Sequence, residues 1–189
     1  MAQRNPSHFL KDINEHFPEK KTEVWFQDET RFGQKTRLTS VWAEKGSRPL
    51  ITKGLGFQNC YLFGSINPET GDHRGFIANC CTTAVMNIHL TDLSESVSND
   101  SHIVLICDQA GWHHSKNLVI PNNISFCFLP AYSPELNPIE RLWLWLKERY
   151  LSNQTFANLE EIIEAGQNAW QKLTRDHVKS VCAVNYTGQ

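Results

Sequence analysis

The sequence lacks an apolar run long enough to cross a bilayer. No purely apolar run is longer than that of residues 103–107, whereas a membrane-spanning helix needs about 20 residues. The first residues, MAQRNPSHFLKDINEHF, contain no continuous apolar stretch of the kind found in secretory signals. We therefore expect a protein that has no membrane partner and works in the cytoplasm.

Cysteine pairs with metal-site spacing are also missing. The chain has 6 cysteines, none of which forms a C-x-x-C pair, so we do not expect a structural zinc site. Cys107 and Cys127 lie inside apolar runs, where buried, reduced thiols are usual. These cysteine positions favour a cytosolic protein without disulfides.

Excess charge of either sign is absent, because the formal net charge is -2 over 189 residues. A dedicated nucleic-acid-binding domain is usually basic. The distribution is nevertheless uneven, with a basic segment at residues 31–53 and an acidic one at residues 158–164. The bases of the first segment are Arg31, Lys35, Arg37, Lys45, Arg48 and Lys53. The basic segment could contact phosphates, but two solvated surfaces explain the charges slightly better.

The order of expected elements indicates an α/β chain of one domain. Strands are expected at residues 23–28, 37–43, 59–66, 73–79, 102–108 and 124–129. Helices are expected within residues 1–20, at 83–97, from Ser115 as N-cap, at 139–151 and at 159–182. Neither repeats nor an internal linker after residue 20 interrupts this order. It favours a mixed sheet flanked by helices.

Two aspartates each follow a buried row of strand residues. Asp28 and Asp108 both share a strand face with the apolar residues two and four positions earlier. If their strands are parallel neighbours, both carboxylates lie at the edge of the sheet where ligands bind. Close carboxylates repel each other unless a cation such as Mg²⁺ or Mn²⁺ lies between them. An isolated Asp more often caps the next turn, and for this pair the two explanations are about even.

Glu140 is the third candidate acid. It lies in the first turn of the helix expected after Pro138, and Asn137 as N-cap would make it part of a capping box. That role requires no chemistry, so a catalytic Glu140 must instead turn towards the two aspartates. Glu29 and Glu135 are weaker candidates, because Glu29 points to the opposite strand face and Glu135 lies in a proline-rich loop.

Histidine and tryptophan side chains surround these acids. The adjacent pair at residues 113–114 cannot readily share one metal, so one histidine could orient Asp108, although a surface position is the simpler expectation. Trp112 could stack on a base or pack over the end of the sheet. Trp143 is interpreted as a core residue that fixes the direction of Glu140.

Four segments then resemble a known family in sequence and order. They are FQDET (26–30), VWAEKGSRP (41–49), CDQAGWHHS (107–115) and LPAYSPELNPIERLW (129–143). Together they resemble the catalytic domain of DDE transposases of bacterial insertion sequences related to mariner. The resemblance covers about residues 20–150, and the run YSPELNPIE is its most specific part.

The resemblance implies an RNase H-like fold with a mixed five-stranded sheet. It implies that Asp28, Asp108 and Glu140 are the catalytic residues and hold two divalent ions, normally Mg²⁺, with Mn²⁺ as a substitute. Such ions hold the attacking and leaving oxygens of an in-line displacement. The implied reaction is cleavage of DNA at the ends of the insertion sequence and joining to a target, commonly at TA.

The same resemblance suggests contacts and partners. The expected DNA-binding side chains are Arg31, Arg37, Trp112, His113, Lys116 and Arg141. Because two ends must be cut, we expect a homodimer on DNA, associated with the bacterial nucleoid when it acts.

The chain departs from the family pattern at three points. Gln109 replaces the Asn that many relatives have after the second aspartate, and the 31 residues between Asp108 and Glu140 are a short spacing. We expect a helical or linker segment at residues 1–20 and the catalytic domain at 21–189, which leaves no room for the usual helix-turn-helix modules. Either a separate polypeptide supplies such a module, or the sequence is a fragment.

Other functions remain open at this stage. The chain could be an inactive or fragmentary RNase H-like relic that still binds DNA. It could also be a general RNase H-like nuclease that acts on structured nucleic acid. A metal phosphohydrolase with another substrate would fit the carboxylates but would leave the four segments unexplained.

Overall fold

The computed structural model describes residues 6–35, 38–40, 42–47, 50, 54 and 56–183. Its sheet consists of β1 (Lys21–Gly33), β2 (Asn59–Ile66), β3 (His73–Ala78), β4 (Ser101–Cys107) and β5 (Ile124–Phe128). The strand order in this described part is β3-β2-β1-β4-β5. β1, β2 and β3 are antiparallel neighbours, while β4 and β5 run parallel to β1. The expected mixed five-stranded sheet is confirmed.

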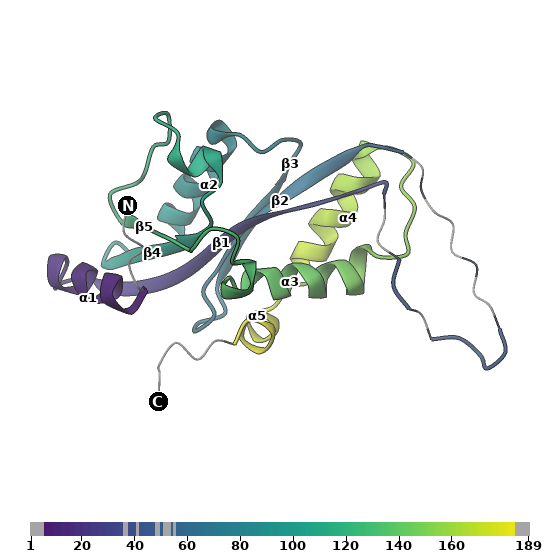
Figure 1. The fold of residues 1–189 in the computed structure, drawn as a ribbon, viewed down its shortest axis with the longest axis horizontal. Helices are drawn as coiled ribbons and strands as arrows, with labels where there is room; N and C mark the ends of the chain where they lie inside the picture. Colours follow the sequence, from purple (N-terminus) through teal and green to yellow (C-terminus); the bar gives the residue numbers. More distant parts are fainter. Residues whose placement is uncertain are drawn as a thin grey trace.

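Helices cover both faces of this sheet (Figure 1). They are α1 (Pro6–His16), α2 (Thr83–Ser96), α3 (Ile139–Leu146), α4 (Leu159–Gln171) and α5 (Arg175–Val181). A wider helical turn at Lys147–Leu151 extends α3. Within the described ranges, none of the helices is both long and apolar enough to cross a membrane.

The alternation of side chains along β1 and β4 separates two cores. Trp25 and Leu105 pack with α2 on one face, whereas Phe26 and Ile106 pack with α3, α4 and α5 on the other. Every residue of β4 is buried, as expected for a strand with neighbours on both edges and helices on both faces.

β1 is longer than expected, and this changes the position of Asp28. Its parallel pairing with β4 ends at Phe26, but its antiparallel pairing with β2 continues to Gly33. Asp28 therefore does not end the strand. It lies two residues past the last β4 partner, where the β4 side of β1 is open.

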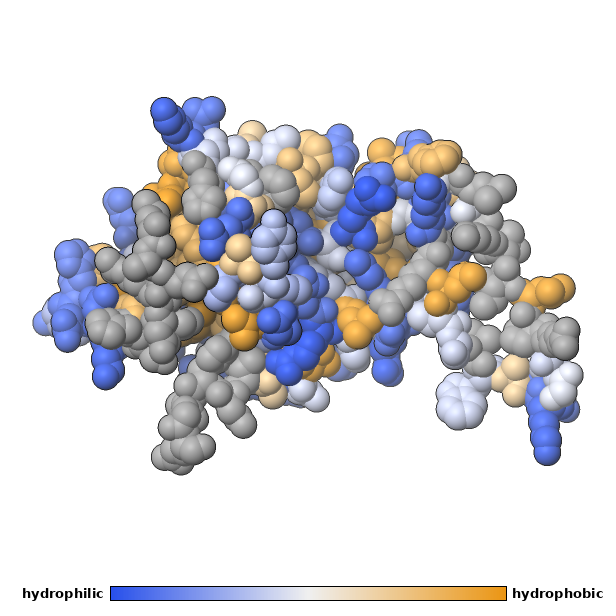
Figure 2. All heavy atoms as spheres, in the orientation of Figure 1, coloured by the Kyte–Doolittle hydropathy of each residue, from blue (hydrophilic) through white to orange (hydrophobic). Residues whose placement is uncertain are grey.

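The strand expected at residues 37–43 is wrong for the part that the structure describes. Residues 38–40 and 42–43 are irregular, while Arg37 and Val41 lie outside the described residues. Thr39 donates its N–H to the Asn153 side chain (3.0 Å) and accepts a bond from it (3.1 Å). These bonds replace a strand ladder. The described parts of this segment extend away from the sheet (Figure 1), and apolar side chains are exposed along it (Figure 2).

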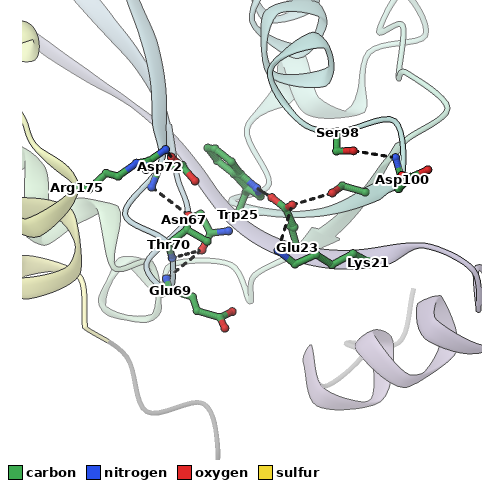
Figure 3. A network of polar contacts seen from close by, with 11 residues as sticks. Lys21, Glu23, Trp25, Asn67, Glu69, Thr70, Asp72, Ser98, Asp100 and Arg175 are labelled. Atoms are coloured by element: carbon green, nitrogen blue, oxygen red, sulfur yellow. Dashed lines mark hydrogen bonds and ion pairs between the residues drawn. The ribbon is translucent and has the colours of Figure 1, made fainter.

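The helices expected from Ser115 and over 159–182 also need correction. A short 3₁₀ helix at Gly111–His114 precedes Ser115, which ends this helix rather than starting one. The helix expected at 159–182 breaks after Gln171, and Thr174 accepts the N–H of His177 (3.2 Å) to begin α5. An ion pair between Arg175 and Asp72 (2.6 Å) ties α5 to the turn between β2 and β3 (Figure 3).

A row of small residues crosses the sheet beside Asp28. Asp28 pairs with Gly64 of β2, which pairs with Gly75 of β3. A Cβ atom at Gly64 would lie 2.5 Å from the ring of Trp143, and one at Gly75 would lie 2.8 Å from the ring of Trp170. The two glycines therefore let two indole rings lie directly on the backbone next to Asp28.

We predict that Gly64→Ala destabilises the fold, because the new methyl group would displace the buried Trp143 ring. Such overpacking costs about 1–3 kcal/mol. Gly111→Ala is the control, since nothing lies within 4 Å of a Cβ at that position. Urea denaturation of both variants measures the difference, and equal stability would contradict the packing described here.

Candidate active site

Asp28, Asp108 and Glu140 line one cavity of about 480 Å³. Asp28 comes from the open edge of β1, Asp108 directly follows β4, and Glu140 lies in the first turn of α3. The loop at residues 129–134 also lines this cavity. The structure thus brings together the three acids that the sequence singled out. In the part of the chain that is described, no three or more His, Cys, Asp or Glu side chains lie close enough together to hold a metal ion as they stand.

A hydrogen bond holds the Asp28 side chain from one side, and its surroundings disfavour the ionised form of its carboxyl group. The indole Nε1 of Trp143 donates a hydrogen bond to its Oδ2 (2.8 Å). Burial, and then the negative charges of Glu140 and Glu29, raise the pKa of Asp28 to about 8, against the opposing effect of the indole bond. A proton or a cation is therefore needed at this carboxyl near neutral pH.

Glu140 does not form the capping box that the sequence allowed. The N–H of Asn137 donates to the carbonyl of Pro134 (2.9 Å), so it is not the partner of the Glu140 carboxylate. The Asn137 side chain instead accepts the N–H of Ile139 (3.4 Å) and donates to the carbonyl of Gln27 (3.0 Å), which ties α3 to β1. Burial raises the pKa of Glu140, Lys147 lowers it and Asp108 raises it.

His113 is buried beneath Asp108 and is not a surface residue. Its Nδ1 lies 3.2 Å from Asp108 Oδ1 and 3.1 Å from the Asp108 carbonyl, and its Nε2 lies 3.8 Å from Glu29 Oε1. Burial opposes its charge, but its interactions with Asp108, Cys107 and Glu29 outweigh burial and raise the pKa of His113 to about 12. With its side chain 1% exposed, His113 lies against Asp108 rather than at the surface, and its expected contact with DNA stays a prediction.

The rival acids lie outside the cavity. Glu29 points to the α2 side of the sheet, as the alternation predicts, and its side chain is 7% exposed. Glu135 is exposed in the loop before α3 and does not line the cavity. Gln109, the unusual residue after Asp108, donates to the carbonyl of Leu129 (2.9 Å) and so links the ends of β4 and β5.

The other expected DNA-binding residues differ from one another in exposure and in contacts. Arg31 is exposed and lines a second cavity of about 160 Å³, together with Lys35 and Lys147. Lys116 is exposed after the 3₁₀ helix, and Arg141 donates to the carbonyl of Ala183 (2.8 Å). Arg37 and the side chain of Trp112 lie outside the described residues.

Sequence reasoning missed the direct contact between Trp143 and Asp28. It treated Trp143 as core for the helix of Glu140, which its 2% exposure supports. A signal was present in the spacing, because residues three apart on a helix lie on neighbouring parts of its surface. A side chain three positions after Glu140 is therefore near whatever Glu140 faces.

We predict that Asp28→Asn flattens the pH dependence of stability in metal-free buffer. Because the folded-state pKa of about 8 lies above the ordinary 3.8, the folded chain keeps a proton that the unfolded chain has lost. The free energy of unfolding therefore falls as pH rises from about 4 to about 8, by at most ~1.4 kcal/mol per pH unit.

Asn cannot ionise and still accepts the indole bond, so the variant should be more stable than the wild type at pH 8. Asp92→Asn, at an exposed position of α2, is the control. Denaturation curves recorded between about pH 5 and about pH 9 check this. Parallel profiles for wild type and Asp28→Asn would contradict the raised pKa.

Comparison with known proteins agrees with this arrangement. Residues 23–163 match the sequence model of the family described as DDE superfamily endonuclease. The chain is 42% identical over 113 residues to the uncharacterized protein y4pE/y4sA of Sinorhizobium fredii, covering 60% of this chain and 84% of that protein. It is 23% identical over 145 residues to the insertion element IS630 uncharacterized 39 kDa protein of Shigella sonnei, covering 75% and 42% respectively.

Solved structures of similar fold include complexes of the Mos1 transposase. The Mos1 mariner paired end complex with Mn has a TM-score of 0.62 at 12% identity, covering 96% of this chain and 60% of that chain. The Mos1 strand transfer complex has a TM-score of 0.61 at 13% identity, covering 93% and 54%. At this identity the likeness shows the fold, and it confirms the expected RNase H-like architecture.

The chain spans less than half of the IS630 protein and just over half of the Mos1 chains. The resemblance to mariner-related insertion-sequence transposases is nevertheless confirmed, both by the family match and by these relatives. Since the matched segment covers most of its length and includes all three acids, this chain belongs to the DDE superfamily endonuclease family.

Proposed function

We propose that this chain is the catalytic domain of an insertion-sequence transposase, which cleaves DNA strands and transfers them to a target. One observation carries the proposal: three carboxylates from β1, the end of β4 and α3 line one cavity. Burial and their mutual repulsion raise the pKa values of Asp28 and Glu140. Carboxylates arranged in this way gain stability when a cation neutralises them.

Asp28, Asp108 and Glu140 would hold divalent ions, with Mg²⁺ as the expected metal and Mn²⁺ as its substitute. Carboxylate oxygens are the hard ligands that these ions prefer. When bound, two such ions supply an activated attacking oxygen and stabilise the leaving oxygen of an in-line phosphoryl transfer. The protein contributes the fixed directions of the carboxylates: Trp143 holds Asp28, and His113 holds Asp108.

DNA is the proposed substrate. The exposed bases Arg31 and Lys116 lie on segments that continue from Asp28 and Asp108, and they could contact phosphates of a bound strand. We propose that the substrates are the ends of an insertion sequence and a target at TA, cut by a dimer on DNA. A helix-turn-helix module would recognise the ends, in the bacterial cytoplasm at the nucleoid.

We predict that Asp108→Asn abolishes Mn²⁺-dependent nicking of DNA. Loss of residues that merely support a metal ligand costs about 10–100-fold, so loss of a ligand should cost at least about 100-fold. The Asp108 side chain is 57% exposed, and its replacement should leave the fold intact, as circular dichroism would show. Asp92→Asn is again the control and should nick DNA at the wild-type rate.

Wild-type nicking by Asp108→Asn would contradict the proposal. A wild-type chain that binds duplex DNA but never nicks it would instead indicate a relic. Faster cleavage of an RNA–DNA hybrid than of an insertion-sequence end would indicate a general RNase H-like nuclease.

A further inference from the structure

Trp143 is enclosed on the α3 face of the sheet, immediately beside Asp28. Its side chain is 2% exposed, and its only polar atom, Nε1, donates to Asp28 Oδ2 at 2.8 Å. Indole is a donor and never an acceptor, so this bond has one direction at every pH. It fixes one oxygen of the carboxyl group and therefore the plane of the whole group.

The position of this ring is determined from several sides. Gly64, the β2 partner of Asp28, leaves no Cβ where the ring lies. Trp170 of α4 packs against it, with ring centroids 6.1 Å apart, and itself occupies the space above Gly75. A ring confined by backbone and by a second indole cannot turn its N–H away from Asp28 without disturbing the packing.

The same helix also carries Glu140, three residues before Trp143. α3 therefore sets the direction of two of the three acids, Glu140 through its own backbone and Asp28 through the indole bond. The bond from the Asn137 side chain to the carbonyl of Gln27 (3.0 Å) fixes the start of α3 against β1 one residue before Asp28. Two separate links thus hold the helix in register with the strand at the site.

We propose that Trp143 is a positioning residue, which holds Asp28 in the orientation that binds the divalent ion. This inference rests on the proposed function, because it assigns a metal to Asp28. Trp170 serves as an internal comparison, since it has the same side chain and shares the packing but makes no bond to Asp28. In metal sites, groups that hydrogen-bond to a ligand typically change metal affinity by about 10–100-fold when they are removed.

The test compares Trp143→Phe with Trp170→Phe in the full chain. Both variants exchange an indole for a phenyl ring, buried at Trp143 and partly buried at Trp170. Both therefore lose an indole N–H, but only Trp143→Phe loses the N–H that donates to Asp28. Isothermal titration with Mn²⁺ alone should show a Kd about 10–100-fold weaker for Trp143→Phe, and a Kd close to that of the wild type for Trp170→Phe. In the nicking assay, Trp143→Phe should need more Mn²⁺ to reach half of its maximal rate.

If Trp143→Phe does not fold, 3-benzothienylalanine at position 143 replaces the N–H by sulfur while it keeps the shape of the ring. The positioning role would be overturned if either this variant or Trp143→Phe bound Mn²⁺ as tightly as the wild type does. Equal loss in the two Phe variants would also overturn it, because packing alone would then explain both. A wild-type chain that binds no Mn²⁺ overturns the proposed function itself, and this inference with it.

Discussion

The site depends on the unequal pairing of β1 with its two neighbours. β1 pairs with β4 only as far as Phe26 but with β2 as far as Gly33. At Asp28 the strand is therefore fixed on one edge and open on the other. The chain after β4 and the start of α3 converge on this opening (Figure 1), and the cavity lined by the three acids lies there. The backbone thus positions Asp28 rigidly while its side chain faces a space that a substrate could enter.

Electrostatic repulsion is the second constraint on the site. Asp28 and Glu140 both have raised pKa values, each partly because of another acid in the same cavity. Two buried side chains hold the acids from opposite faces of the sheet. Trp143 binds Asp28 from the α3 side, and His113 binds Asp108 from the α2 side. Asp28 and Asp108 are thus each contacted by one buried ring, and Asp108 Oδ1 also accepts the N–H of Ala110 (2.9 Å). The negative charge at the site is what a divalent cation would neutralise.

Much of this arrangement could be predicted from the sequence. The alternation of apolar residues identified Asp28 and Asp108, and their strands are indeed parallel neighbours. For Glu140 the sequence left a capping role equally open, because the choice depends on whether the N–H of Asn137 has another partner. That partner, the carbonyl of Pro134, belongs to a loop conformation that no residue pattern specifies.

The remaining errors have similar tertiary causes. Residues 37–43 have strand-forming side chains, but Thr39 bonds to Asn153 rather than to a strand. The length of β1 was underestimated because its last residues are partly polar and are held by β2 instead of by an apolar face. His113 was expected at the surface because its burial requires the short 3₁₀ helix after Asp108 to fold back beneath the end of β4. Local sequence carries little information about such returns of the chain.

The central claim is that Asp28, Asp108 and Glu140 form a site for divalent metal. Anomalous diffraction from a crystal of this chain soaked with Mn²⁺ tests it most directly. The account predicts anomalous density within the cavity, in contact with Asp28 and Asp108 and on the side that Glu140 faces. Mn²⁺ bound only elsewhere on the chain, with the three carboxylates left uncoordinated, would contradict it.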